Sequence, residues 1–117
     1  MGLDTSHNCW HGSYTSFNEF RFALGRQIGI NLSEYIGFGG DKDPDSVKHD
    51  ANPLLFHSDC DGELSVDESK RIVTGLNDIL EKFNLNIANY TGIEQDIIQF
   101  RDGCLDAISK NETIDFH

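Results

Sequence analysis

The stretch from His57 to Glu68, HSDCDGELSVDE, concentrates side chains that can bind cations or polar ligands. It holds five carboxylates, a histidine and a cysteine around one glycine. Hard divalent cations are bound by several oxygen ligands that converge on a tight turn. This acidic loop, defined here as residues 57–68, could therefore be a metal loop or one wall of a ligand pocket. It could also be an acidic turn that starts a helix, because the helix dipole favours acids there.

The spacing of the acidic loop matches a calcium-binding EF-hand loop at every ligand position except the first. With Gly62 at the glycine position, the ligand positions fall on His57, Asp59, Asp61, Glu63, Ser65 and Glu68. A nitrogen ligand at the first position favours a transition metal such as zinc or manganese over calcium. Pro53 also interrupts the segment that would form the incoming helix. One hypothesis is thus a divalent cation, Ca, Mn or Zn, bound by His57, Asp59, Asp61, Glu63 and Glu68.

A second group of chemically useful side chains lies in DTSHNCWHGSYTSF, residues 4–17. Its rings and imidazoles follow no helical or strand period before Ser16, so they do not form a core pattern. Planar ligands bind by stacking on aromatic faces, with a few polar groups around the rim. The N-terminal cluster supplies four such side chains: His7, Trp10, His11 and Tyr14. Arg21 and Arg26 could meet a phosphate or carboxylate.

Two other interpretations of the N-terminal cluster remain open. His7, Cys9 and His11 stand at alternate positions and could bind zinc in an extended loop, with Cys60 or His57 as the fourth ligand. The aromatic side chains could instead pack the N-terminal loop onto the helices. If the cluster and the acidic loop meet in space, they line one ligand pocket formed by His7, Trp10, His11, Tyr14, Arg21, His57, Asp59 and Asp61.

Three capping-box patterns indicate the helices that would position these groups. They pair Ser16 with Glu19, Ser65 with Glu68, and Thr91 with Glu94. Apolar residues then recur at helical spacing, which predicts helices over 17–28, 66–83 and 93–109, the last capped by Asn111. The expected fold is all-α: a small three-helix domain over residues 1–117, with long N-terminal and central loops.

Composition and charge limit the functional classes. The chain has 117 residues and no apolar run near the roughly 20 residues that a membrane span needs. Its formal net charge is −11, and residues 41–117 hold 17 acidic and 7 basic side chains. Nucleic-acid binding through a basic face is therefore not expected, and an anionic ligand would have to bind near residues 1–40. The lack of a secretory signal pattern and of CxxC spacing predicts a cytoplasmic protein with reduced thiols.

Three segments carry a resemblance to known sequences. The opening MGLDTSHNCWHGSYTSFNEFR, the HSDCDGEL loop and the terminal DFH resemble a group of short proteins of bacteriophages and some bacteria, which is defined by sequence rather than by function. Phages carry many small acidic proteins that disable host defences, and one class sequesters nucleotide immune signals of the ADP-ribose type. The resemblance implies such a counter-defence sponge, acting in the host cytoplasm.

The leading expectation is a non-catalytic binder of a small nucleotide-like ligand. Trp10 and Tyr14 would stack on the base, while His7, His11, Arg21 and residues 57–61 would fix its polar groups. A homo-oligomer would add pocket walls. One alternative is an EF-hand-like or mixed His/Asp metal-binding protein. The other is a metal-assisted hydrolase that uses His57, Asp59 and Asp61 to activate water, so that enzymatic activity stays open while binding is favoured.

Overall fold

The chain begins with a β-hairpin where a loop was expected. Strands β1 (Gly2–Asp4) and β2 (His11–Ser13) pair antiparallel. The short 3-10 turn η1 (Ser6–Asn8) connects them, with positive φ at His7 and Asn8. The computed structural model describes residues 2–58, 61–88 and 90–117. Strands of three residues are too short to show an alternating pattern, so the sequence offered no signal for this hairpin.

Helix α1 (Tyr14–Gln27) begins three residues earlier than predicted. The prediction that Ser16 caps it is wrong, because the Ser13 hydroxyl accepts a hydrogen bond from the Ser16 amide at 3.0 Å. Its buried face carries apolar side chains at helical spacing and one charged residue, Arg21, which is only 4% exposed. A buried arginine on an otherwise apolar face needs partners nearby.

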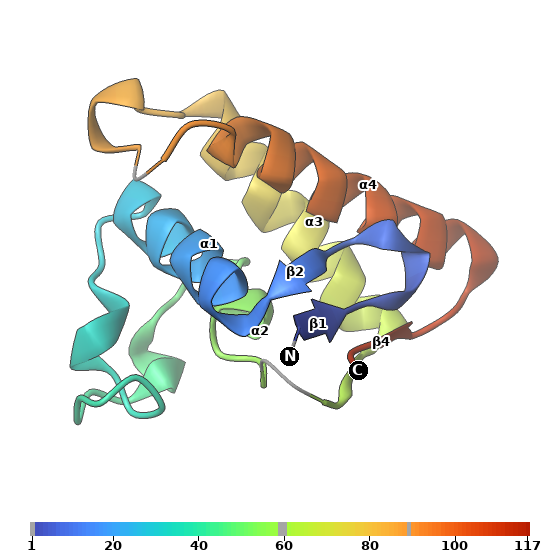
Figure 1. The fold of residues 1–117 in the computed structure, drawn as a ribbon, viewed down its shortest axis with the longest axis horizontal. Helices are drawn as coiled ribbons and strands as arrows, with labels where there is room; N and C mark the ends of the chain where they lie inside the picture. The colour runs from blue at the N-terminus through green and yellow to red at the C-terminus, as the bar shows by residue number, and fades with distance from the viewer. Residues whose placement is uncertain (1, 59–60, 89) are drawn as a thin grey trace.

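Short elements occupy the central region. They are the 3-10 turns η2 (Leu32–Glu34) and η3 (Pro44–Ser46) and the four-residue helix α2 (Asn52–Leu55). Between η2 and η3 the chain folds back on itself, since Tyr35 forms a bridge with Lys42. The sequence predicted a loop here, and in the structure this loop projects beside α1 (Figure 1).

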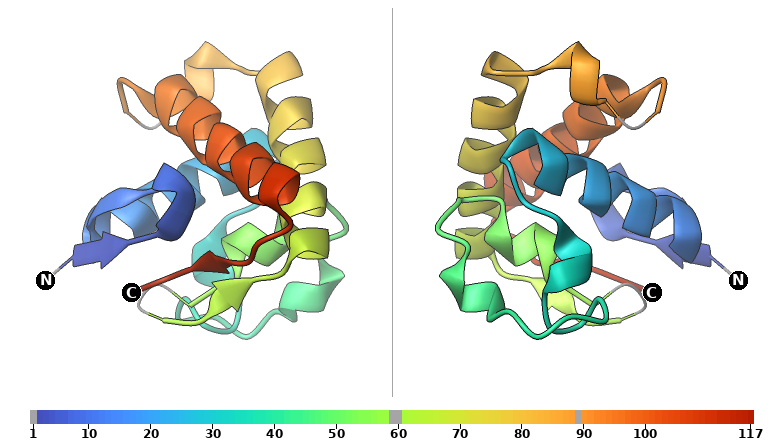
Figure 2. Two further views of the ribbon diagram at one scale, coloured as in Figure 1. Left: turned by 90° about the vertical axis from the view of Figure 1, so that its right-hand side faces the viewer. Right: turned by 90° about the vertical axis from the view of Figure 1, so that its left-hand side faces the viewer.

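Helices α3 (Val66–Glu81) and α4 (Ile93–Lys110) pack against each other and run in opposite directions (Figures 1 and 2). The capping box of Ser65 and Glu68 is confirmed. The Thr91 box is wrong, because the residue that caps α4 is Gly92, whose φ is 95° and which makes no side-chain cap hydrogen bond. Asn111 is confirmed as the C-terminal cap, with a left-handed φ of 54°. The short turn η4 (Leu85–Ile87) lies between the two helices.

The C-terminal strand joins the two ends of the chain. Strand β4 (Ile114–Asp115) pairs antiparallel with β3 (Glu63–Leu64), which lies inside the acidic loop. The following residues turn to the N-terminus, where Phe116 bridges Thr5 and the Asp4 amide donates to the His117 carbonyl at 2.8 Å. The two chain ends therefore lie close together (Figure 1).

The prediction of an all-α domain with three helices is wrong. The described residues form four α-helices and two two-stranded antiparallel sheets. The missed elements are only two to four residues long, so none of them is long enough to show a periodic pattern in the sequence. Strand β3 also pairs with β4, which lies far along the chain. Across the described part of the chain, no helix is long and apolar enough to cross a membrane.

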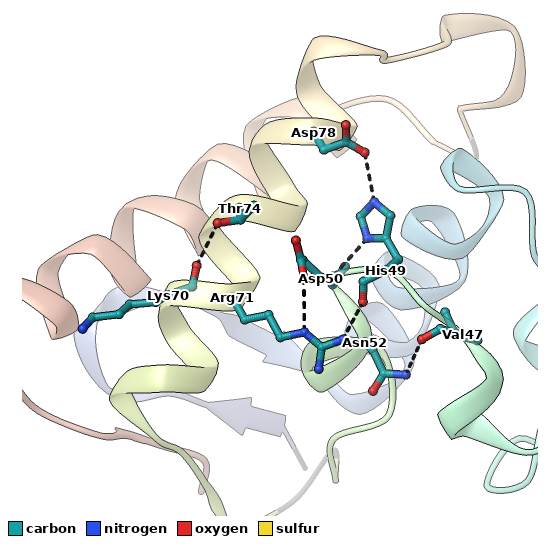
Figure 3. A network of polar contacts seen from close by, with 9 residues as sticks. Val47, His49, Asp50, Asn52, Lys70, Arg71, Thr74 and Asp78 are labelled. Atoms are coloured by element: carbon teal, nitrogen blue, oxygen red, sulfur yellow. Dashed lines mark hydrogen bonds and ion pairs between the residues drawn. The ribbon is translucent and has the colours of Figure 1, made fainter.

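A polar network fixes the segment before α2 against α3 (Figure 3). Arg71 donates to the His49 carbonyl at 3.2 Å and to the Asp50 carboxylate at 3.3 Å. The Ala51 amide donates to His49 Nδ1 at 3.0 Å, so His49 Nε2 carries the proton and donates to Asp78 at 3.0 Å. The network sets where α2 and the residues after it can lie.

Gly75 allows the same segment to approach α3 closely. A Cβ at this position would lie 2.4 Å from the Ala51 amide nitrogen. We expect Gly75→Ala to lower the free energy of unfolding by about 1–3 kcal/mol through overpacking, although alanine normally favours a helix. Urea unfolding measures this change. Thr74→Ala, at an exposed position on the same helix, is the control. A Gly75→Ala variant that is as stable as the wild type, or more stable, would contradict the close approach.

The carboxylate of Asp78 makes the free energy of unfolding depend on pH. Its pKa is held below the ordinary value of 3.8, first by the hydrogen bond from Lys82 and then by that from His49. A lowered carboxylate pKa gives stability above pH 3.8, and this stability is lost as the pH falls through the folded value. Asp78→Asn should therefore be less stable than the wild type at neutral pH, with a difference that narrows in acid. Urea midpoints across pH test this, with Glu81→Gln as the control.

Candidate functional site

A chain of four rings connects the three segments that carry the resemblance. The ring centroids of Trp10 and Phe17 lie 5.5 Å apart, those of Phe17 and Phe116 6.0 Å, and those of Phe116 and His57 4.1 Å. The ring chain thus passes from the N-terminal cluster through α1 and the C-terminal strand to the acidic loop. The two segments that were expected to meet are in contact through it.

Trp10 occupies the core rather than the wall of an open pocket. Its side chain is 6% exposed and its ring stacks on Phe20 with centroids 5.0 Å apart. The buried indole Nε1 has no hydrogen-bond partner among the described residues. Tyr14 is partly buried and packs against the same core. Little ring surface of Trp10 therefore remains for the base-stacking role that the sequence suggested.

The two histidines of the N-terminal cluster hold the hairpin in place. His7 Nε2 lies 2.9 Å from the Glu112 carboxylate, just beyond α4. His11 Nδ1 lies 2.9 Å from the Asp4 carboxylate, and its Nε2 lies 2.8 Å from the Asn8 side-chain oxygen. These contacts cross-link the strands of the hairpin and attach it to the end of α4.

Cys9 is not placed to join these histidines around zinc. It is fully buried, and its thiol forms a hydrogen bond with the thiol of Cys104 on α4. That bond and burial both raise the pKa of the Cys104 thiol, so it stays protonated at neutral pH. Among the described residues, His7, Cys9 and His11 do not form a group that could hold a metal ion. Of the two fourth ligands considered above, Cys60 lies outside the described residues, and both ring nitrogens of His57 lie within hydrogen-bond distance of backbone carbonyls.

The described part of the acidic loop is closed by its own backbone. Both ring nitrogens of His57 face carbonyl oxygens, Nδ1 that of Ser58 at 2.8 Å and Nε2 that of Glu63 at 3.1 Å. In an EF-hand the carbonyl at the Glu63 position faces the ion. Glu68 instead accepts a hydrogen bond from the Ser65 amide at 2.9 Å, as a capping box requires.

Asp61 and Asp59 are the two remaining carboxylates of the predicted ligand pocket. Asp61 is exposed beside Gly62, whose φ of 89° makes the turn. Asp59 lies outside the described residues. Among the residues that the structure does describe, no group of three or more His, Cys, Asp or Glu side chains could hold a metal ion. The described geometry therefore fits the turn and helix start better than the metal loop.

Arg21 is where α1 meets the acidic loop. Its guanidinium donates to the carbonyl of His57, with a longer contact to that of Leu55 at 3.4 Å. Its Cζ lies 4.7 Å from the centroid of Phe17 and 5.0 Å from that of Phe38. Aromatic faces and carbonyl oxygens offset the cost of burying the charge. Arg21 thereby fixes the start of the acidic loop on α1.

A cleft of about 290 Å³ opens beside Arg21. Its lining residues are Asn18, Arg21, Ile36, Gly37, Phe38, Pro44, Phe56, His57 and Ser58. We call it the Arg21 cleft. Two of the predicted ligand residues, Arg21 and His57, lie on it, whereas five other described ones do not: His7, Trp10, His11, Tyr14 and Asp61. Sequence reasoning missed its walls because Ile36 and Phe38 belong to the folded-back loop, which showed no periodic pattern.

The chain was compared with protein-family models, with curated proteins and with solved structures, and none of the three comparisons found a match. The resemblance of the three segments to phage and bacterial proteins therefore stays a hypothesis. The functional proposal below therefore rests on the residues around the Arg21 cleft.

Phe116 should be essential for the convergence of the three segments. It is 4% exposed and its ring contacts those of Phe17 and His57. We expect Phe116→Ala to lower the free energy of unfolding by about 3–5 kcal/mol, because it leaves a cavity between three segments. Urea unfolding measures the loss, and Phe83→Ala, at a partly exposed site, should cost less. Equal costs would contradict the role given to Phe116.

Proposed function

We propose that this protein binds a small nucleotide-like ligand in the Arg21 cleft without changing it chemically. The observation that carries the proposal is the contact of Arg21 with the His57 carbonyl, which brings α1 and the acidic loop to the same cleft. In this proposal the base stacks not on Trp10 but on rings that line the cleft, which are Phe38, Phe56 and His57.

The volume and lining of the cleft indicate which part of the ligand enters it. Ligand pockets typically measure about 300–1,000 Å³, so a cleft of about 290 Å³ suits one ring system rather than a whole dinucleotide. Rings supply stacking surface, and the partly exposed Asn18, whose side-chain oxygen accepts a hydrogen bond from Arg21, supplies a polar side chain beside them. The sugar and phosphates would extend into solvent.

The state of His57 supports binding rather than catalysis. A general base needs a ring nitrogen aimed at the group that it deprotonates. Both nitrogens of His57 instead face the backbone carbonyls of Ser58 and Glu63. The imidazole therefore shapes the wall of the cleft.

The biological role that we propose is the sequestration of a nucleotide immune signal of the ADP-ribose type. This part rests on the resemblance to phage proteins and requires a cytoplasmic location, in the host if the gene is carried by a phage. A homo-oligomer would extend the shallow cleft with walls from a second copy. No bound metal is needed in this proposal.

Filling the cleft tests the proposal directly. Ile36 lines the cleft and is 57% exposed, so Ile36→Trp should block the cleft with little effect on folding. We expect calorimetry with ADP-ribose to show at least about tenfold weaker binding, which corresponds to ~1.4 kcal/mol. Leu105→Trp, at a position on α4 that is 45% exposed, should bind like the wild type.

Native mass spectrometry completes the experiment by giving the bound mass and the number of subunits. An unchanged ligand mass after incubation is expected. A wild-type protein that binds no ADP-ribose at millimolar concentration, or equal binding by Ile36→Trp, would refute the proposed site. A hydrolysed ligand would show catalysis instead of sequestration.

A further inference from the structure

A second cleft of about 610 Å³ lies at the C-terminal end of α1. Its lining residues are Phe22, Arg26, Gly29, Ile30, Asn31, Glu34, Tyr35, Lys42 and Ile87. It shares none of these with the Arg21 cleft. Two ring contacts form the wall between the clefts, that of Phe22 with Phe38 at 5.5 Å and that of Tyr35 with Phe56 at 5.6 Å. We call it the Arg26 cleft.

The Arg26 cleft combines two cations with one carboxylate in a chain of net charge −11. The side chain of Arg26 is exposed, and among the described residues it has no hydrogen-bond or ion-pair partner. Lys42 Nζ lies 3.0 Å from the Glu34 carboxylate, and both side chains are about half exposed. Exposed ion pairs of this kind contribute little free energy, so an incoming anion can displace Glu34 from Lys42.

The floor of the cleft suits a planar or aliphatic group. Tyr35 is 7% exposed and lies under Lys42, whose Nζ is 5.8 Å from the ring centroid, so this ring shapes the cleft and leaves the contact surface to its neighbours. Phe22 and Ile30 are partly buried and pack against the core beside it. Asn31 uses its side-chain oxygen to accept from the Ser33 amide and hydroxyl, which leaves its NH₂ as a donor.

We infer that the Arg26 cleft binds a small phosphomonoester. The planar guanidinium of Arg26 matches phosphate oxygens bidentately, and Lys42 adds a second positive charge. The organic part of the ligand packs on Phe22 and Ile30, which line the cleft and are partly exposed. Glu34, once displaced from Lys42, accepts hydrogen bonds from sugar hydroxyls. This site is independent of the Arg21 cleft and goes beyond the function proposed above.

Titration with adenosine 5′-monophosphate and with adenosine, followed by amide NMR, tests the inference. The monophosphate should shift the amides of Gly29, Ile30 and Asn31, whereas adenosine at the same concentration should not. Binding should weaken at least tenfold in Arg26→Gln and in Lys42→Gln, and should weaken as salt is added. Lys70→Gln, which removes an exposed charge on α3 outside both clefts, is the matched control.

The outcomes separate this inference from the proposed function. Equal shifts with adenosine, or unchanged binding by Arg26→Gln and Lys42→Gln, would overturn it. Shifts confined to Gly37 and Phe38 would also overturn it, because they would place the monophosphate in the Arg21 cleft. Ile36→Trp should leave the shifts at Gly29 and Ile30 intact. Thermal unfolding of each variant confirms that a loss of binding is not a loss of folding.

Discussion

Residues 114–117 are hydrogen-bonded on both edges. These hydrogen bonds position the N-terminal hairpin and the acidic loop relative to each other. One edge pairs with β3 inside the acidic loop, and the Phe116 amide donates to the Gly62 carbonyl at 2.9 Å. The other edge bonds to Asp4 and Thr5 of the N-terminal hairpin. Pairs of two or three residues are not stable alone. Each pairing therefore depends on the side chains packed beneath it, above all Phe116 between Phe17 and His57.

Arg21 extends this convergence from the strands to α1. A buried guanidinium is costly unless its donors and its charge are compensated. Its contacts with the His57 carbonyl and with Phe17 and Phe38 join three segments that would otherwise pack separately. The Arg21 cleft is therefore largely shaped before a ligand arrives, which lowers the entropy lost on binding. The same contacts explain why filling the cleft is a cleaner test than removing Arg21.

Local signals in the sequence predicted the three long helices but neither the short helix α2 nor any strand. The capping box at Ser65 and the cap at Asn111 depend on residues within one turn, so they could be found directly. The start of α4 at Ile93 was predicted correctly, but its Thr91 capping box was not, because Gly92 takes the cap position in a left-handed conformation without a side-chain cap. Strands β1 to β4 depend on partners elsewhere in the chain. The burial of Trp10 likewise depends on α1 packing over it, which its neighbours in sequence do not reveal.

The geometry of α1 decides whether its two arginines, Arg21 and Arg26, can contact the same ligand, which the composition of the chain does not. Both were expected to meet the anionic part of one ligand, because they lie in the near-neutral N-terminal region. Five residues of an α-helix correspond to a rotation of roughly 140° beyond one full turn, so Arg21 and Arg26 point to different sides of α1. Arg21 is consequently buried against the acidic loop, while Arg26 remains exposed at the helix end. The wall formed by Phe22 and Phe38 then separates their clefts, so a small ligand can contact only one of them.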